Sequence, residues 1–65
     1  MLSDVQREID AAKRANAAMS EAVGKFINAC KAGDVAAAEQ HHLEATAYLE
    51  AELDAWKRAW RRVHG

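Results

Sequence analysis

The segment Lys31-Ala32-Gly33-Asp34 is the one break in a helical pattern that otherwise runs through all 65 residues. Gly33 can adopt the left-handed backbone conformation that ends a helix, and Asp34 can cap the helix that follows. A connection this short returns the second helix antiparallel beside the first. The sequence therefore predicts an all-α antiparallel two-helix hairpin, with a helix over 4–32, a turn at 33 and a helix over 34–64. Ser3 and Gln6 have the spacing of a capping box at the start of the first helix.

Apolar side chains recur every three or four residues on both sides of the turn, as in helices that pack along their length. Folding at Gly33 brings Trp56 over the smaller Ile9 and Ala12, and large residues against small ones fill a core without strain. Asn16 is a polar residue within this pattern, where it either fixes the register or forms a partly hydrated layer. We expect the two patterns to form the seam between the helices. They comprise Leu2, Val5, Ile9, Ala12, Asn16, Met19, Val23, Phe26 and Cys30, and then Val35, Glu39, His42, Thr46, Leu49, Leu53, Trp56, Trp60 and Val63.

A second apolar strip flanks the predicted seam and consists mostly of alanine. A two-helix hairpin needs one apolar stripe per helix, so the extra width indicates contact with a further helix. A chain this small seldom stabilises itself alone. We therefore predict a single domain over 1–65 that assembles as a dimeric four-helix bundle or docks on another protein. The strip comprises Ala15, Ala22, Ala29, Ile27, Leu43 and Ala45.

Length and composition argue against an enzyme. A chain of 65 residues has little room for a deep cleft, and it offers no nucleophile paired with a base and an orienting acid. Cys30 falls on the predicted seam, where a small core residue is expected. Glu39 and His42 have the Glu-x-x-His spacing of di-metal bundles, but one chain supplies too few ligands, and only an oligomer could complete the site. We expect no enzyme activity, no cofactor and no metal site in the single chain.

The overall charge predicts no general attraction to nucleic acid or to a membrane. The formal net charge is −1 at pH 7, and no apolar run approaches the roughly 20 residues that span a bilayer. The first ten residues are charged and periodic, unlike a secretory signal. We expect a cytoplasmic protein without membrane contact.

Charge is uneven along the second predicted helix. Residues 34–54 contain six acidic and no basic side chains, whereas the last turns contain Lys57, Arg58, Arg61 and Arg62. Basic residues stabilise the C-terminus of a helix, and Asp54 can pair with Arg58 four residues on. The four basic residues are also a candidate patch for phosphate or for an acidic protein surface.

These features favour a non-enzymatic protein-interaction module that binds and sequesters, inhibits or chaperones a partner protein through a helical face. The second apolar strip would make close contacts with the partner, and an acidic face would determine the orientation and the choice of partner. Tyr48, Glu44 and Glu52 form that acidic face, on which the tyrosine either contacts a partner or lies flat on its own helix. The alternative is a nucleic-acid-binding dimeric regulator that uses the basic C-terminal end. A second alternative is a phage-type inhibitor of a host system.

Two small families share this pattern of two long helices about a Gly-Asp turn. The turn at residues 31–34, followed by Ala47-Tyr48-Leu49-Glu50-Ala51, resembles the helical-hairpin co-chaperones of type III secretion needle subunits, which implies binding to another protein. The architecture is also similar to Rop-type plasmid regulators, dimeric four-helix bundles that bind paired RNA loops. That resemblance implies an RNA-binding face, on which Arg7, Lys13, Arg14 and Lys25 can be placed, with Asp4, Glu8 and Asp10 interleaved among them.

Overall fold

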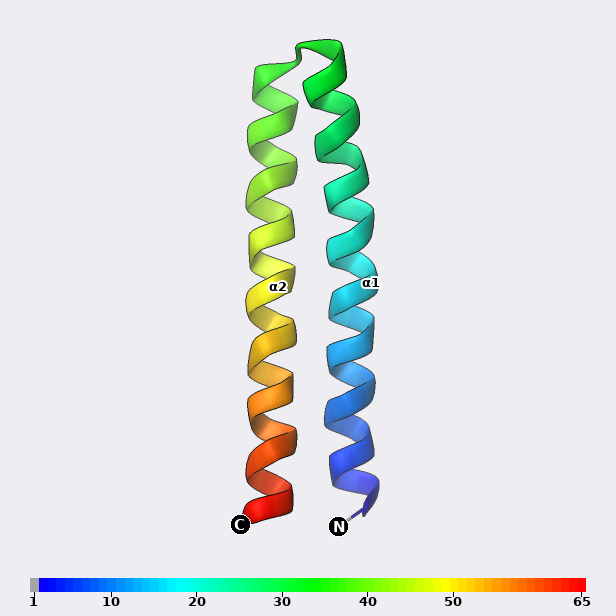
Figure 1. Cartoon of the computed structure of the whole chain (residues 1–65), viewed down its shortest axis with the longest axis vertical. Helices are drawn as coiled ribbons and strands as arrows, with labels where there is room; N and C mark the ends of the chain where they lie inside the picture. Colours follow the sequence, from blue (N-terminus) through cyan, green and yellow to red (C-terminus); the bar gives the residue numbers. More distant parts are fainter. Residues whose placement is uncertain (1) are drawn as a thin grey trace.

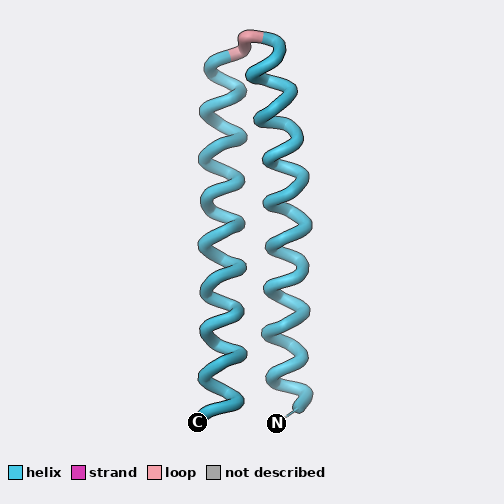
Figure 2. The backbone as a smooth tube through the Cα atoms, viewed as in Figure 1, coloured by secondary structure: helices cyan, strands magenta, loops and turns pink. Residues whose placement is uncertain are grey.

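The computed structural model describes residues 2–65, with side chains from Ser3 onward, as an antiparallel two-helix hairpin. Helix α1 spans Leu2–Ala32 and helix α2 spans Val35–His64. The helices run side by side, and both chain ends lie at the end of the rod opposite the turn (Figure 1). A short loop joins them (Figure 2), and the Cα trace measures 48 × 14 × 10 Å. The predicted all-α hairpin is confirmed, while the predicted seam position of Leu2 lies outside the described side chains.

Gly33 and Asp34 form the turn as the sequence predicted. Gly33 has a φ of 72°, which places it in the left-handed region. Its N–H donates to the carbonyl of Cys30 at 3.1 Å, and the N–H of Asp34 donates to the carbonyl of Ala29 at 2.9 Å. This pair of bonds is a Schellman motif, which satisfies carbonyl groups at the end of α1. The Asp34 side chain accepts the N–H of Ala37 at 3.1 Å and caps the start of α2.

The start of α1 differs from the prediction. The helix begins at Leu2, so Ser3 lies within it and is not the capping residue. Gln6 is not a capping partner either, because its side-chain amide donates to Asp10 Oδ1 at 2.9 Å, one helical turn further on. The predicted capping box is therefore wrong.

Alanine forms the contact between the two helices. The five buried hydrophobic residues of the described chain are all alanine: Ala12, Ala22 and Ala29 in α1, and Ala55 and Ala59 in α2. A methyl side chain allows two helix backbones to approach closely. Each buried methyl group contributes only about 0.8 kcal/mol, or about 4 kcal/mol for five. Close approach, and not a large apolar core, characterises this hairpin.

The predicted seam of α2 is wrong in its rotational position. All nine of its residues, from Val35 to Val63, are exposed, and Trp60 is 65% exposed. The inward side of α2 instead follows Ala38, Ala45, Ala55 and Ala59. In α1 most of the described seam is correct, because Val5, Ile9, Ala12, Met19 and Phe26 are buried or half-buried. Asn16, Val23 and Cys30 are instead exposed.

The turn should depend on the backbone freedom of Gly33. Gly33→Ala should lower the free energy of unfolding by about 1–2 kcal/mol, because an L-residue with a Cβ is disfavoured in the left-handed region. Gly24 is the matched control, since it lies within α1 at an ordinary φ and no atom lies within 4 Å of a Cβ built there. Gly24→Ala should stabilise the chain by about 0.5–1 kcal/mol. Urea unfolding at one protein concentration measures the free energy of unfolding of both variants. If both substitutions changed stability in the same direction, the proposed role of the Gly33 backbone would be contradicted.

Enlarging the alanine contact should separate the helices. Ala55 is 1% exposed, so Ala55→Leu places three extra carbon atoms where α1 leaves no room and should cost about 1–3 kcal/mol. Ala51→Leu adds the same atoms at an exposed position of α2 and should change stability by less than about 0.5 kcal/mol. Thermal unfolding followed by circular dichroism compares the two variants. Equal melting temperatures would show that α1 and α2 are not in close contact at Ala55.

Candidate functional site

The large apolar side chains that α1 and α2 leave exposed lie along one stripe of each helix, and we call these two stripes together the apolar face. Leu53 is half exposed, and neighbouring Trp56 and Trp60 are 41% and 65% exposed. Single exposed apolar residues are ordinary on a protein surface, but a contiguous set of large ones marks an interaction site. The apolar face comprises Val23 and Ile27 of α1, and Val35, Leu49, Leu53, Trp56, Trp60 and Val63 of α2, while Leu43 is exposed beside it, on the side of α2 away from α1.

Helix geometry places the two halves of the apolar face on the same side of the hairpin. Successive residues of an α-helix are about 100° apart, so in each helix the exposed apolar stripe lies about 110° around the axis from the alanine stripe. In both helices the rotation from the alanine stripe to the exposed stripe has the same direction when the helix is viewed from its N-terminus. Because α1 and α2 run in opposite directions, equal offsets turn both stripes toward one side. The hairpin therefore has one apolar side and one polar side.

The aromatic end of the apolar face contains a groove. Leu53, Trp56, Lys57, Trp60 and Arg61 line it. The Trp60 ring lies against the ring of His64, with 3.7 Å between centroids. The aromatic and aliphatic side chains of the groove are flanked by the cations Lys57 and Arg61. Protein interfaces have a similar composition, with an apolar centre and a polar rim.

Glu52 links α1, α2 and the apolar face. One of its carboxylate oxygens accepts from Asn16 Nδ2 across the helix contact at 3.1 Å, and the other accepts from Trp56 Nε1 at 3.1 Å. Asn16 is exposed at the edge of the apolar face, not half-buried in a seam between α1 and α2. Its polar group therefore holds Glu52 in place, and Glu52 in turn orients the Trp56 indole.

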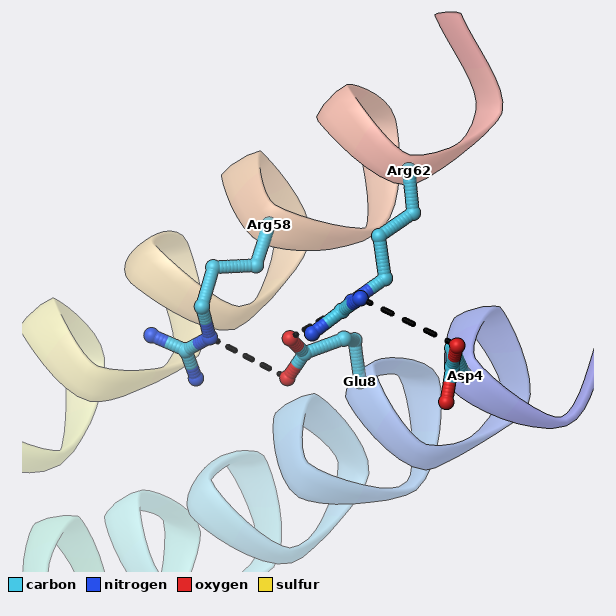
Figure 3. A network of polar contacts seen from close by, with 4 residues as sticks. All are labelled: Asp4, Glu8, Arg58 and Arg62. Atoms are coloured by element: carbon cyan, nitrogen blue, oxygen red, sulfur yellow. Dashed lines mark hydrogen bonds and ion pairs between the residues drawn. The ribbon is translucent and has the colours of Figure 1, made fainter. Parts of the chain in front are cut away.

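A network of ion pairs joins the helices at the open end of the rod. Arg58 Nε donates to Glu8 Oε1 at 3.1 Å, and Arg62 Nε donates to Glu8 Oε2 at 3.3 Å. Arg62 also lies 3.9 Å from Asp4, and Figure 3 shows both arginines extending from α2 toward α1. The Glu8 side chain is only 13% exposed. The hydrogen bond from Arg58, with that from Arg62, lowers the pKa of Glu8 from its ordinary value of 4.5 against the opposing effect of burial.

The predicted basic patch is divided between two surfaces. Arg58 and Arg62 are paired with Glu8 and Asp4, so the predicted pair of Arg58 with Asp54 is replaced by contacts between helices. Lys57 and Arg61 border the tryptophan groove and take part in no ion pair within the described part of the chain. Arg61 also lines a hollow with Arg58 and Arg62, so it lies between the ion-pair network and the groove.

The predicted partner-binding residues are also divided. Ala22 and Ala29 are buried between the helices, and Ala15 and Ala45 are half-buried there, so the alanine strip is not a free docking surface in this hairpin. Ile27 and Leu43 are exposed on or beside the apolar face.

The predicted acidic face is likewise not a single surface. Glu44 Oε1 lies 2.7 Å from Nδ1 of His41, and Glu44 lines a shallow hollow on the polar side together with Tyr48 and Lys25. Glu52, in contrast, lies against α1. Tyr48 is 40% exposed beside the helix contact.

The interhelical role of Glu8 and Glu52 was missed from the sequence, although a signal was available. Each residue stands in a seven-residue repeat of alanines, Glu8 before Ala15, Ala22 and Ala29, and Glu52 between Ala45 and Ala59. A carboxylate in a stripe of small residues needs a polar or cationic partner from the facing helix. Arg58 and Asn16 supply those partners here.

The remaining candidates for chemistry are isolated. Glu39 and His42 are exposed near the turn, and His42 lies against Phe26 with 5.9 Å between ring centroids. Within residues 2–65, no group of three or more His, Cys, Asp or Glu side chains is placed to hold a metal ion. Cys30 is a free, exposed thiol, which corrects its predicted place in the core.

Comparisons of the chain with protein-family models, with curated proteins and with solved structures found no match. Neither α1 nor α2 is long and apolar enough to cross a membrane. The candidate site therefore rests on the geometry of the hairpin itself.

Stability should depend on the ionisation of Glu8. Because its folded-state pKa is lowered, its contribution is complete above the usual value of 4.5 and is lost as the pH falls through the lowered pKa. Glu8→Gln should therefore lower the melting temperature at pH 7, with a smaller difference from wild type at pH 3. Glu21→Gln is the control, because Glu21 pairs only with Lys25 of its own helix, at 3.8 Å and largely exposed. A difference for Glu8→Gln that is the same at both pH values would contradict the ionic role.

Proposed function

We propose that the chain is a non-enzymatic protein-interaction module that docks through its apolar face onto an α-helical surface of another protein. The supporting observation is that the alanine contact holds the hairpin together while the largest side chains are left uncovered. A rigid pair of long helices presents those side chains at regular helical spacing. Helix-on-helix packing requires that spacing.

The detailed composition of the apolar face supports a specific contact. Trp56 and Trp60 are of the residue type most enriched among energetically dominant interface positions. The indole of Trp56 is held by Glu52, so less side-chain entropy is lost when a partner binds. Lys57 and Arg61 can pair with acidic groups on the partner because they are not engaged within the hairpin.

Such docking would cover the corresponding apolar surface of the partner. A stoichiometric complex of this kind can keep an aggregation-prone helix dissolved, sequester it, or block its normal contact. A co-chaperone, an adaptor and an inhibitor of the phage type all act in this way. None of these roles needs a catalytic group.

A nucleic-acid-binding regulator is the second candidate, because the tryptophans are exposed beside two cations. Exposed rings can stack on bases, and Lys57 and Arg61 can contact phosphate. The pairing of Arg58 and Arg62 with Glu8 and Asp4 weakens this candidate. The two cations beside the tryptophans give little of the affinity that comes from counterion release.

A substitution in the apolar face should abolish retention of the partner. We expect Leu53→Asp to reduce the partner recovered from the lysate of the native host by about tenfold or more, since a buried charge would replace an anchor. Ala47→Asp places the same charge at an exposed position of α2 away from the apolar face, and it should retain the partner. Quantitative mass spectrometry of the bound proteins, with and without nuclease, is the measurement. Trp60→Ala, which removes a 65% exposed side chain, serves as a milder second variant.

Circular dichroism of each variant separates loss of binding from loss of folding. Equal retention by helical Leu53→Asp and by wild type would overturn the proposed surface. Recovery of nucleic acid in place of protein, lost on nuclease treatment and on neutralising Lys57 and Arg61, would establish the second candidate instead.

A further inference from the structure

The hairpin exposes more surface than a compact protein of its size. Its accessible surface is 4788 Å², whereas a globular monomer of 7.1 kDa exposes about 4,100 Å². The excess of about 700 Å² is close to the roughly 800 Å² that each partner buries in an interface of standard size. The extended shape of the hairpin therefore leaves about as much surplus surface as one protein contact would cover.

The direction of that face relative to the helix contact specifies a bundle. In a four-helix bundle each helix touches two neighbours that lie about 90° apart around its axis. Both helices of this hairpin have two stripes about 110° apart, the inward alanine stripe and the outward stripe of large residues. Each helix can therefore pack on one helix of its own chain and on one helix from outside the chain. When two such hairpins stack face to face, each of the four helices has both of these neighbours.

We propose that a second copy of this chain covers the apolar face, with the turn of one hairpin beside the chain ends of the other. The assembly is an antiparallel four-helix bundle in which α1 packs on α1 and α2 packs on α2 of the second copy. The contact uses the surface of the proposed function, so a partner protein and the second copy compete for it.

Charge complementarity favours one relative direction of the two hairpins. The half of the rod nearest the chain ends, residues 1–16 and 50–65, has seven basic and six acidic side chains. The half nearest the turn, residues 17–49, has two basic and four acidic ones. Reversing the second hairpin puts the net positive half beside the net negative half, whereas aligned hairpins put like beside like.

Side-chain size also favours the reversed arrangement. Asn16 and Glu52 lie at the same level of the rod, so reversal about that level places the bulky Trp56 and Trp60 opposite the part of the second copy's α2 that contains His42 and Thr46. Large groups then meet smaller ones. In α1, reversal about Asn16 pairs Ile9 with Val23, because these residues are equally spaced on either side of it. Asn16 then lies at the two-fold axis, where a polar residue can fix register.

The native cysteine permits a direct test of the dimer and of the reversed direction of its second copy. Cys30 is the single cysteine and is exposed near the turn, so a nitroxide label there marks one end of each rod. In the reversed dimer each label lies 14 residues from Asn16, on opposite sides of the two-fold axis, and the labels are therefore about 40 Å apart. In an aligned dimer they would lie within about 25 Å. Double electron–electron resonance measures this distance, and sedimentation equilibrium of labelled and unlabelled protein measures the mass.

We expect twice the chain mass at micromolar concentration and a label distance near 40 Å. A label on Asn28→Cys in a Cys30→Ala background, away from the apolar face, should give about 36 Å, because Asn28 lies 12 residues from Asn16. A monomer throughout the concentration range, or an assembly larger than two, would overturn the self-association. A distance within about 25 Å at both sites would overturn the reversed direction.

Variants connect the dimer to the apolar face and separate it from partner binding. Leu53→Asp should be monomeric and Ala47→Asp dimeric, and a dimeric Leu53→Asp would overturn the assigned surface. These measurements use the purified chain without a partner. If the wild type is a monomer and still retains a partner protein through Leu53, the dimer is contradicted but the proposed function is not. If the wild type is a dimer and the Leu53→Asp variant still retains the partner, the proposed function is contradicted but the dimer is not.

Discussion

Close contact between alanine stripes is the constraint on which the rest of the structure depends. Ala12, Ala22, Ala29, Ala55 and Ala59 are the buried hydrophobic residues of the described chain, and their methyl groups allow α1 and α2 to approach each other. A stripe of alanines has no room for a large side chain, so the leucines and tryptophans of α2 must point elsewhere. The exposed apolar face is therefore a direct consequence of how the helices pack.

The few polar residues in this contact have a structural and a functional effect. Glu8 and Glu52 occupy positions of the alanine stripe, and each is paired across the hairpin, with Arg58 and with Asn16. These bonds favour one register of α1 against α2, because a shift of one helical turn would leave partly buried carboxylates unpaired. They also determine which cations remain available, since Arg58 and Arg62 are engaged while Lys57 and Arg61 border the groove.

An interaction module with a small internal core depends on its partner for part of its stability. Five buried methyl groups contribute little compared with the conformational entropy lost by 65 residues. Covering the apolar face, by a second copy or by another protein, adds the burial that the hairpin lacks. Binding and folding are then thermodynamically linked, because a ligand of the folded state shifts the unfolding equilibrium.

The sequence alone determined the two helices, their antiparallel return and the turn, because Gly33, Asp34 and the spacing of apolar residues act through local backbone preferences. It also showed that each helix has two apolar stripes. Only the tertiary structure decided which stripe faces the other helix. Sequence reasoning gave that place to the larger side chains of α2, since burial energy grows with area, but close approach along the alanines prevailed. Periodicity defines the faces of one helix, whereas their pairing depends on the shapes of both helices together.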